Sequence, residues 1–95
     1  MIRYALILTF LLTQTVNATP LFKKCMSCHG PKAMGKRSTK APRLAGQKAW
    51  YIEGQLKLYK SKKRKGGRSA MMYGVAKKLS KKDMKELAEY LEALK

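Results

Sequence analysis

Apolar residues recur along this chain at spacings of three and four, which is the period of a helix buried on one face. The spacing predicts a helix over residues 47–60, with its buried stripe formed by Ala49, Ile52, Leu56 and Tyr59. Trp50 lies off that stripe. No stretch shows the strict alternation typical of a strand, and no internal repeat is present.

The last part of the chain carries the clearest helical pattern. Its apolar stripe consists of Met84, Leu87, Ala88, Leu91 and Leu94. Ser80 precedes the stripe and Asp83 follows three residues later, which is a variant of the capping box that begins many helices. We therefore expect the final helix to begin just after Ser80.

A shorter helix is expected over residues 19–28. Thr19 is a suitable N-cap and Pro20 suits the first helical position. In one continuous helix, Leu21, Cys25 and Cys28 would share a face. Gly30 and Pro31 would end it, and Leu21 would meet Tyr90 where the first and last helices cross.

The remaining segments are predicted to be loops. Residues 31–46 and 60–68 are rich in Gly, Pro and basic residues, and residues 69–76 are expected to be mostly loop. The fold class is therefore all-α, with three main helices and long loops. Loops of this length are unusual in a small domain unless they wrap around something.

The first residues have the features of an export signal. Arg3 supplies a positive charge, residues 5–12 are apolar, and small residues lead to Ala18. The apolar run is shorter than the ~20 residues that cross a bilayer. We expect residues 1–18 to be a signal peptide and 19–95 to be one domain in the periplasm, with no stable membrane insertion after the signal is removed.

The charge balance is strongly basic. Lys and Arg number 22 against 5 Asp and Glu, which gives a formal net charge of +17. A field of this sign steers acidic partners toward the molecule. Export and the lack of aromatic residues within the lysine-rich segment 60–68 exclude nucleic acid as the expected partner.

All the Cys and His residues of the chain lie within the five residues Cys25-Met26-Ser27-Cys28-His29. Three kinds of site use such residues. A structural zinc site needs four ligands, and only three are available here. A thiol–disulfide exchange motif normally follows a strand, which the pattern lacks. Covalent attachment of a c-type haem is the third possibility, and it uses every one of these residues.

The haem interpretation gives each residue of the motif a role. The Cys25 and Cys28 thiols add across two vinyl groups of the porphyrin, and the next residue, His29, supplies the proximal ligand to the iron. A domain of this size has little core of its own, and a large apolar cofactor would complete it. The long loops would then have a surface to wrap around.

A second axial ligand is expected to be a methionine, because the chain has no other histidine. Met26 lies inside the motif, Met34 follows it too closely, and Met84 belongs to the stripe of the last helix. Met71 and Met72 lie far enough downstream to reach the opposite side of the ring. In an extended loop, neighbouring side chains point opposite ways, so only one of the two would bind.

The chain resembles the class I cytochromes c, especially one half of the bacterial dihaem cytochromes c and their short monohaem relatives. The matching segments are Cys25–Gly30, Pro42–Gln47, Tyr51-Ile52, Gln55-Leu56, Met71-Met72, Ala76, Leu79-Ser80 and Leu87–Leu91. In that pattern the ligand methionine stands seven residues before the leucine that precedes the last helix. The resemblance therefore implies Met72 as the distal ligand, with Met71 as the fallback.

The same resemblance implies a role for Pro42 and a function for the whole chain. The Pro42 carbonyl would accept a hydrogen bond from Nδ1–H of His29 and fix its ring. The fold would be a small cytochrome c fold around one covalent haem c and its iron. The protein would be a monomeric, soluble periplasmic one-electron carrier, with no catalytic residues, and not an enzyme. The alternatives are a haem enzyme or gas binder with a labile sixth ligand, or a basic secreted protein without haem.

Basic residues are expected to border the haem and to guide transient docking with acidic redox partners. They are Lys23, Lys24, Lys32, Lys36, Lys40, Lys62, Lys63, Lys65, Lys77 and Lys78. Arg64 or Arg68 is expected to pair with a haem propionate, because the guanidinium fork suits a carboxylate.

Overall fold

A computed structural model describes residues 19–94 of the chain. The predicted signal peptide, residues 1–18, lies outside the described residues. Within the described part, the helices are α1 (Thr19–Phe22), α2 (Met26–His29), α3 (Ala49–Lys60), α4 (Ser69–Lys77) and α5 (Lys81–Ala93). Residues 19–94 contain no strand, only an isolated bridge between Lys36 and Ala41. The all-α prediction is therefore confirmed for this part of the chain.

Helix α5 begins where the sequence predicts. The Ser80 hydroxyl accepts from the backbone N–H of Asp83, and the Asp83 carboxylate accepts from the N–H of Ser80, at 3.0 and 2.9 Å. These hydrogen bonds hold the pKa of Asp83 below its ordinary value. The predicted stripe faces the core, with Leu87 and Leu91 almost wholly buried.

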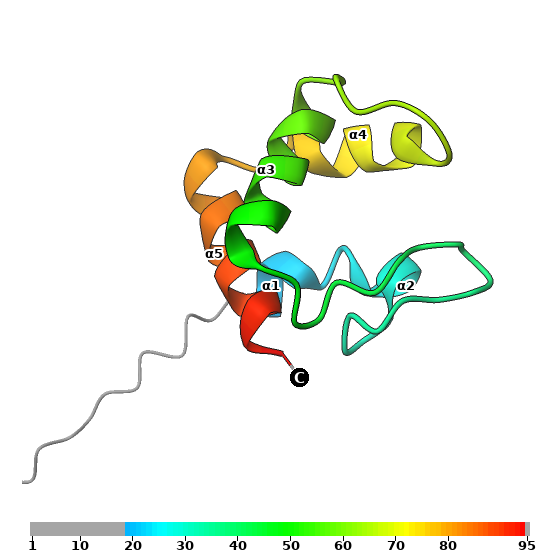
Figure 1. The fold of residues 1–95 in the computed structure, drawn as a ribbon, viewed down its shortest axis with the longest axis vertical. Coiled ribbons are helices and arrows are strands. Elements are labelled where there is room, and N and C mark those ends of the chain that lie inside the picture. Colours follow the sequence, from blue (N-terminus) through cyan, green and yellow to red (C-terminus); the bar gives the residue numbers. More distant parts are fainter. Residues whose placement is uncertain (1–18, 95) are drawn as a thin grey trace, which may run out of the picture.

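Helix α3 packs against both α4 and α5, and Figure 1 shows it between them. Ile52 and Leu56 are buried, as the stripe predicts. The N-terminus of α3 has no side-chain cap of its own. Instead, Glu92 of α5 accepts a 2.6 Å hydrogen bond from the backbone N–H of Ala49. A carboxylate at a helix N-terminus is favourable, so this contact joins α3 to α5.

The expected single helix over residues 19–28 is wrong, because the chain turns at residues 23–25 and separates α1 from α2. The first and last helices meet at Tyr90, as predicted, but the fully buried residue of α1 is Phe22 rather than Leu21. Phe22, 1% exposed, packs against Tyr90 with ring centroids 5.8 Å apart, while Leu21 is only partly buried. Because of this turn, Phe22 packs against α5, and the residues after it do not continue along the same helix.

The expected loop over residues 69–76 is also wrong, because Ser69–Lys77 forms helix α4. The Ser69 hydroxyl and backbone N–H both bond to the carbonyl of Gly66, and Ala76 is fully buried. Tyr73 lies 6.5 Å from Tyr59 of α3, ring centroid to ring centroid. Packing against α3 therefore stabilises a segment whose local sequence is only weakly helical.

The two predicted loops leave the same side of the molecule. Residues 30–48 follow α2 and residues 61–68 join α3 to α4, and Figure 1 shows both projecting away from α5. Among the described residues, no helix is long and apolar enough to cross a membrane.

Candidate functional site

A cavity of about 700 Å³ lies between α3, α4 and the segment that contains α2. Its deepest wall is the core itself, because buried side chains of α3 and α5 line it. These are Ile52, Leu56, Leu87 and Leu91. The two long loops also contribute lining residues. The two long loops therefore border the cavity and would surround a molecule bound in it.

The first and second cysteines and the histidine of the motif all line this cavity. Cys25 and Cys28 are free thiols, each partly exposed, while His29 is 6% exposed. Burial raises the pKa of the Cys25 thiol above its ordinary value; Cys28 acts in the same direction and Lys24 opposes it. The Cys25 sulfur is thus kept in its neutral S–H form before any cofactor is attached.

The ring of His29 is oriented by a backbone carbonyl. Nδ1 lies 2.9 Å from the carbonyl oxygen of Pro42. A carbonyl can only accept, so Nδ1 carries the proton and donates it, and Nε2 keeps its lone pair. This is the tautomer of a metal-binding histidine, with a second group that fixes the plane of the ring.

Loop 31–41 is attached to the C-terminus of α2, where helix carbonyls lack intrahelical partners. The Thr39 hydroxyl donates to the carbonyl of Cys28 at 2.6 Å, and the Lys36 ammonium donates to that of Ser27 at 3.0 Å. The backbone N–H of Lys36 also bonds to the carbonyl of Ala41 at 3.1 Å. These contacts hold the segment that carries Pro42, and no pattern in the sequence indicates the role of Thr39.

Gly35 is the position where this loop passes closest to the Pro42 segment. Its φ is +86°, and a Cβ there would lie 2.9 Å from both the Ala41 oxygen and the Arg43 nitrogen. Both neighbours are backbone atoms, so the loop itself would have to move. Glycine at this position therefore permits the approach that places the Pro42 carbonyl beside His29.

We expect Gly35→Ala to destabilise the cofactor-loaded protein by about 1–3 kcal/mol, through the strained φ and the displaced Pro42 segment. Denaturant unfolding measures the loss. Gly54→Ala is the matched control, because a Cβ at Gly54 has nothing within 4 Å. In a helix this control should stabilise slightly. Equal midpoints for the two variants would contradict the role given to Gly35.

The methionines named above as candidate iron ligands lie in different parts of the structure. Met72 of α4 lines the cavity, is partly buried and packs against the core. Met71 also lines the cavity, but it is 60% exposed. Neighbouring residues on a helix point about 100° apart, not opposite ways as in an extended loop. Met84 is buried in the core and Met34 is 49% exposed on loop 31–41, and neither lines the cavity.

Arg64 is held at the mouth of the cavity by several contacts. Its Nη1 donates to Oε1 of Gln55 at 2.7 Å, and its guanidinium carbon lies 4.7 Å from the ring centroid of Tyr59. The Tyr73 hydroxyl bonds to the carbonyl of the same arginine. Arg68 lines the cavity too. A fixed guanidinium here is suited to a carboxylate on a bound molecule.

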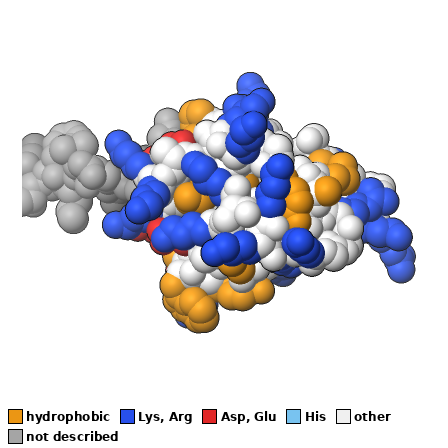
Figure 2. All heavy atoms as spheres, turned by 90° about the horizontal axis from the view of Figure 1, so that it is seen from above, with side chains coloured by type: hydrophobic (Ala, Val, Ile, Leu, Met, Phe, Trp, Pro, Cys, Tyr) orange, Lys and Arg blue, Asp and Glu red, His pale blue; other side chains and the backbone are white. Residues whose placement is uncertain are grey.

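The charges around the cavity are all of one sign. The basic residues that line it are Lys24, Lys40, Arg64, Lys65 and Arg68. The carboxylates lie on α3 and α5 and none lines the cavity: Glu53, Asp83, Glu86, Glu89 and Glu92. Figure 2 likewise shows acidic side chains only toward one end of the molecule. Of the lysines expected at the haem border, Lys24, Lys40 and Lys65 line the cavity.

These residues fit a covalently bound haem. The site offers two thiols, a buried imidazole with its Nε2 lone pair available, an apolar wall and thioethers on α4. Within residues 19–94, no group of three His, Cys, Asp or Glu side chains is placed to hold a metal ion. The described residues therefore do not form a structural zinc site.

Comparisons with known proteins agree with this chemistry. The family model "Cytochrome c" matches residues 16–95. Cytochrome c-554(548) of Halomonas halodenitrificans is 39% identical over 66 residues, which cover 70% of this chain and 78% of the relative. A thiosulfate dehydrogenase electron acceptor of Thiomonas intermedia is 38% identical over 69 residues, covering 73% of this chain and 31% of the relative.

The fold agrees with a solved structure as well. The crystal structure of reduced cytochrome c4 from Pseudomonas stutzeri superposes with a TM-score of 0.68 and 37% identity, over 75% of this chain and 38% of that chain. The chain thus spans well under half of these longer relatives. The family match and the site residues lead to one conclusion: this chain belongs to the cytochrome c family, whose members are electron-transfer proteins that carry covalently bound haem c.

Proposed function

We propose that this chain is a periplasmic monohaem cytochrome c that carries single electrons, with its iron ligated by His29 and Met72. The observation that carries the proposal is the cavity, which has His29 in the wall formed by α2 and Met72 in the wall formed by α4. Met72 is favoured over Met71 because it is turned toward the core. In this proposal, residues 1–18 are removed on export and residues 19–95 form a monomeric domain.

Each residue of the site then has a separate task. Cys25 and Cys28 hold the haem, and Pro42 keeps the His29 ring in its ligating tautomer. The haem supplies an iron that changes its charge by one electron. A thioether opposite the imidazole favours the ferrous state and raises the potential. If His29 and Met72 both bind the iron, the protein would leave no position for a substrate, and the site would transfer electrons rather than catalyse a reaction.

The cationic rim supports docking with acidic redox partners. It consists of the basic residues that line the cavity, while the carboxylates lie elsewhere on α3 and α5. Such an arrangement orients the cavity toward an anionic partner and accelerates encounter without a stable complex. One relative is named as an electron acceptor of thiosulfate dehydrogenase, and we propose a dehydrogenase as the class of electron donor for this chain.

Electron-exchange rates with charged small molecules test this proposal. The reduced haem protein is mixed with anionic hexacyanoferrate(III), and in a second series with a cationic cobalt(III) complex. We expect the rate with the anion to fall as salt is added and the rate with the cation to rise, because screening removes attraction in one case and repulsion in the other.

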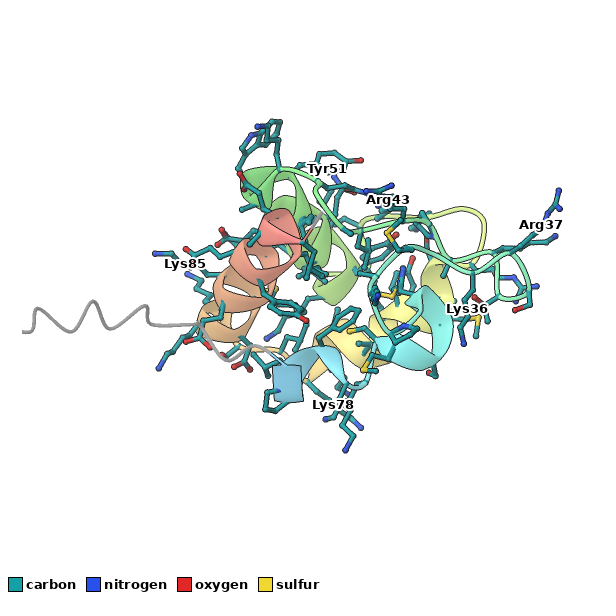
Figure 3. The ribbon with its side chains drawn as sticks, turned by 90° about the horizontal axis from the view of Figure 1, so that it is seen from below. Lys36, Arg37, Arg43, Tyr51, Lys78 and Lys85 are labelled. Atoms are coloured by element: carbon teal, nitrogen blue, oxygen red, sulfur yellow. The ribbon has the colours of Figure 1, made fainter. Side chains whose placement is uncertain are left out.

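Two charge reversals place the docking face. Lys65 lines the cavity, whereas Lys85 lies on α5, and Figure 3 shows Lys85 far from the loop that carries Arg37. Both substitutions to Glu change the net charge equally. We expect Lys65→Glu to slow oxidation by hexacyanoferrate about threefold more than Lys85→Glu. Equal effects would mean that only the net charge matters, and the proposed docking face would be wrong.

A further inference from the structure

Helix α4 turns one face to the cavity and another to α3. Met72 and Val75 line the cavity, whereas Tyr73 does not, and its ring lies beside Tyr59 of α3. Because successive residues of a helix point about 100° apart, Met72 and Tyr73 belong to different faces of the same turn. A contact that fixes Tyr73 therefore also fixes the direction in which the Met72 side chain points.

The segment just before α4 does not fix the helix by packing. Gly66 and Gly67 have φ of +95° and +51°, and a Cβ at either position would have nothing within 4 Å. The bonds from Ser69 to Gly66 span only three residues, so they shape the turn without tying α4 to another part of the chain. Figure 1 shows α4 alongside α3, joined to it by the loop of residues 61–68. The orientation of α4 therefore depends on its contacts with α3 and with the start of this loop.

Arg64 gives α4 a fixed hydrogen-bond acceptor. Its backbone N–H donates to the carbonyl of Leu58 at 3.3 Å, and its guanidinium donates to Gln55 and lies over the ring of Tyr59. All three partners belong to α3. Since both the backbone and the side chain of Arg64 are bound to α3, its carbonyl is held in one direction. The Tyr73 hydroxyl donates to that carbonyl.

A second hydrogen bond holds the far end of α4. The ammonium group of Lys60, the last residue of α3, donates to the carbonyl of Leu79, which lies just after α4. A bond at the end of a helix limits how far the helix can slide, but it leaves the helix free to rotate about its own axis. The Tyr73 hydroxyl bonds from the side of the helix, one residue from Met72, and so it limits that rotation.

We propose that Tyr73 is a positioning residue for the axial methionine. The hydrogen bond from its hydroxyl to the Arg64 carbonyl holds α4 in the rotation at which the Met72 sulfur reaches the iron. The inference rests on the proposed function, in which Met72 is the distal ligand. Tyr73 does not line the cavity, so it acts through Met72 and not on the cofactor. Without the hydroxyl, α4 rotates more freely and the methionine leaves the iron more often.

Carbon monoxide binding to the reduced haem protein tests the proposal, because the gas binds only when the methionine has left the iron. At saturating gas, the observed rate is the rate at which the methionine–iron bond opens. Tyr73→Phe keeps the ring beside Tyr59 and removes only the hydroxyl. We expect it to raise the limiting rate about tenfold, which is the effect of losing about one hydrogen bond. The matched control is Tyr90→Phe, which removes the hydroxyl of a ring that packs on Phe22 away from the cavity and should leave the rate unchanged.

A double-variant comparison separates positioning from a general loss of stability. In a Met72→Ala background, Tyr73→Phe should no longer change the rate of gas binding, because no methionine is left to position. A tenfold effect that persists in this background would overturn the proposal. Equal limiting rates for the natural chain and Tyr73→Phe would overturn it too, while leaving Met72 as the ligand. If Met72→Ala itself leaves the rate of the natural chain unchanged, the proposed ligand is wrong, and the positioning role is wrong with it.

Discussion

Replacing both Cys25 and Cys28 with alanine is expected to abolish folding of the domain, not only its colour. Without thioether bonds the haem is not held covalently, so mass spectrometry should find only the polypeptide. Circular dichroism should then show most of the helix content lost. The physical reason is that the cavity between α3, α4 and the α2 segment, and the two long loops that line it, would lose the cofactor that they surround.

The size of the cavity supports this expectation. About 700 Å³ of space lies between α3, α4 and the segment that contains α2, so without a cofactor water rather than packed atoms would meet these elements. A typical domain has a total stability of only about 5–15 kcal/mol, so the loss of the contacts made by so large a cofactor is expected to unfold it.

Ser27→Ala is the matched control for the cysteine variant, since it changes an exposed residue between the two thiols and leaves both in place. It should retain the covalent haem and the helix content. A colourless double alanine variant with the helix content of the natural chain would show that the polypeptide folds by itself, and the role given to the cofactor in the core would be wrong.

Replacing Met72 with alanine is expected to have the second largest effect. The reduction potential should fall by on the order of 0.2 V, since axial ligands set haem potentials over a range of about 0.8 V and methionine raises them. The oxidised protein should lose the weak long-wavelength band that reports a methionine–iron bond. The reduced variant should bind carbon monoxide readily, whereas the natural chain should not.

Met71→Ala is the control, because Met71 is the exposed neighbour on the same helix. It should keep the band, the potential and the resistance to carbon monoxide. The reverse outcome would make Met71 the ligand. If the natural chain itself binds carbon monoxide readily, the iron has an open or labile position, and the alternative of a haem enzyme or gas binder would replace the electron carrier.

Local signals were enough to predict some elements. The Ser80–Asp83 capping box acts over three residues, and the stripes of α3 and α5 are fixed by helical geometry. The C-x-x-C-H motif is equally local, which is why its attachment chemistry could be inferred without a structure. The family comparison agrees with that inference.

Helix α4 shows where local signals were insufficient. It follows Gly66-Gly67, contains Gly74 and Val75, and has no side-chain N-cap. Each of these features disfavours a helix in isolation. The helix forms because Ala76 and Tyr73 pack on partners from other parts of the chain. Because this segment is a helix and not an extended loop, the Met71 and Met72 side chains point about 100° apart rather than in opposite directions.

The sequence by itself determined the chemistry: which residues can hold a haem, that the domain is all-α, and that its charge is strongly basic. Only the tertiary structure decided how these residues are arranged. The Phe22–Tyr90 contact and the Glu92 cap on α3 join residues that are distant in sequence, and the approach of Gly35 to the Pro42 segment lies in a loop that has no periodic pattern. Periodicity and capping describe interactions within one or two helical turns. They carry no information about which side chain of another segment fills a gap, so packing across the chain had to supply it.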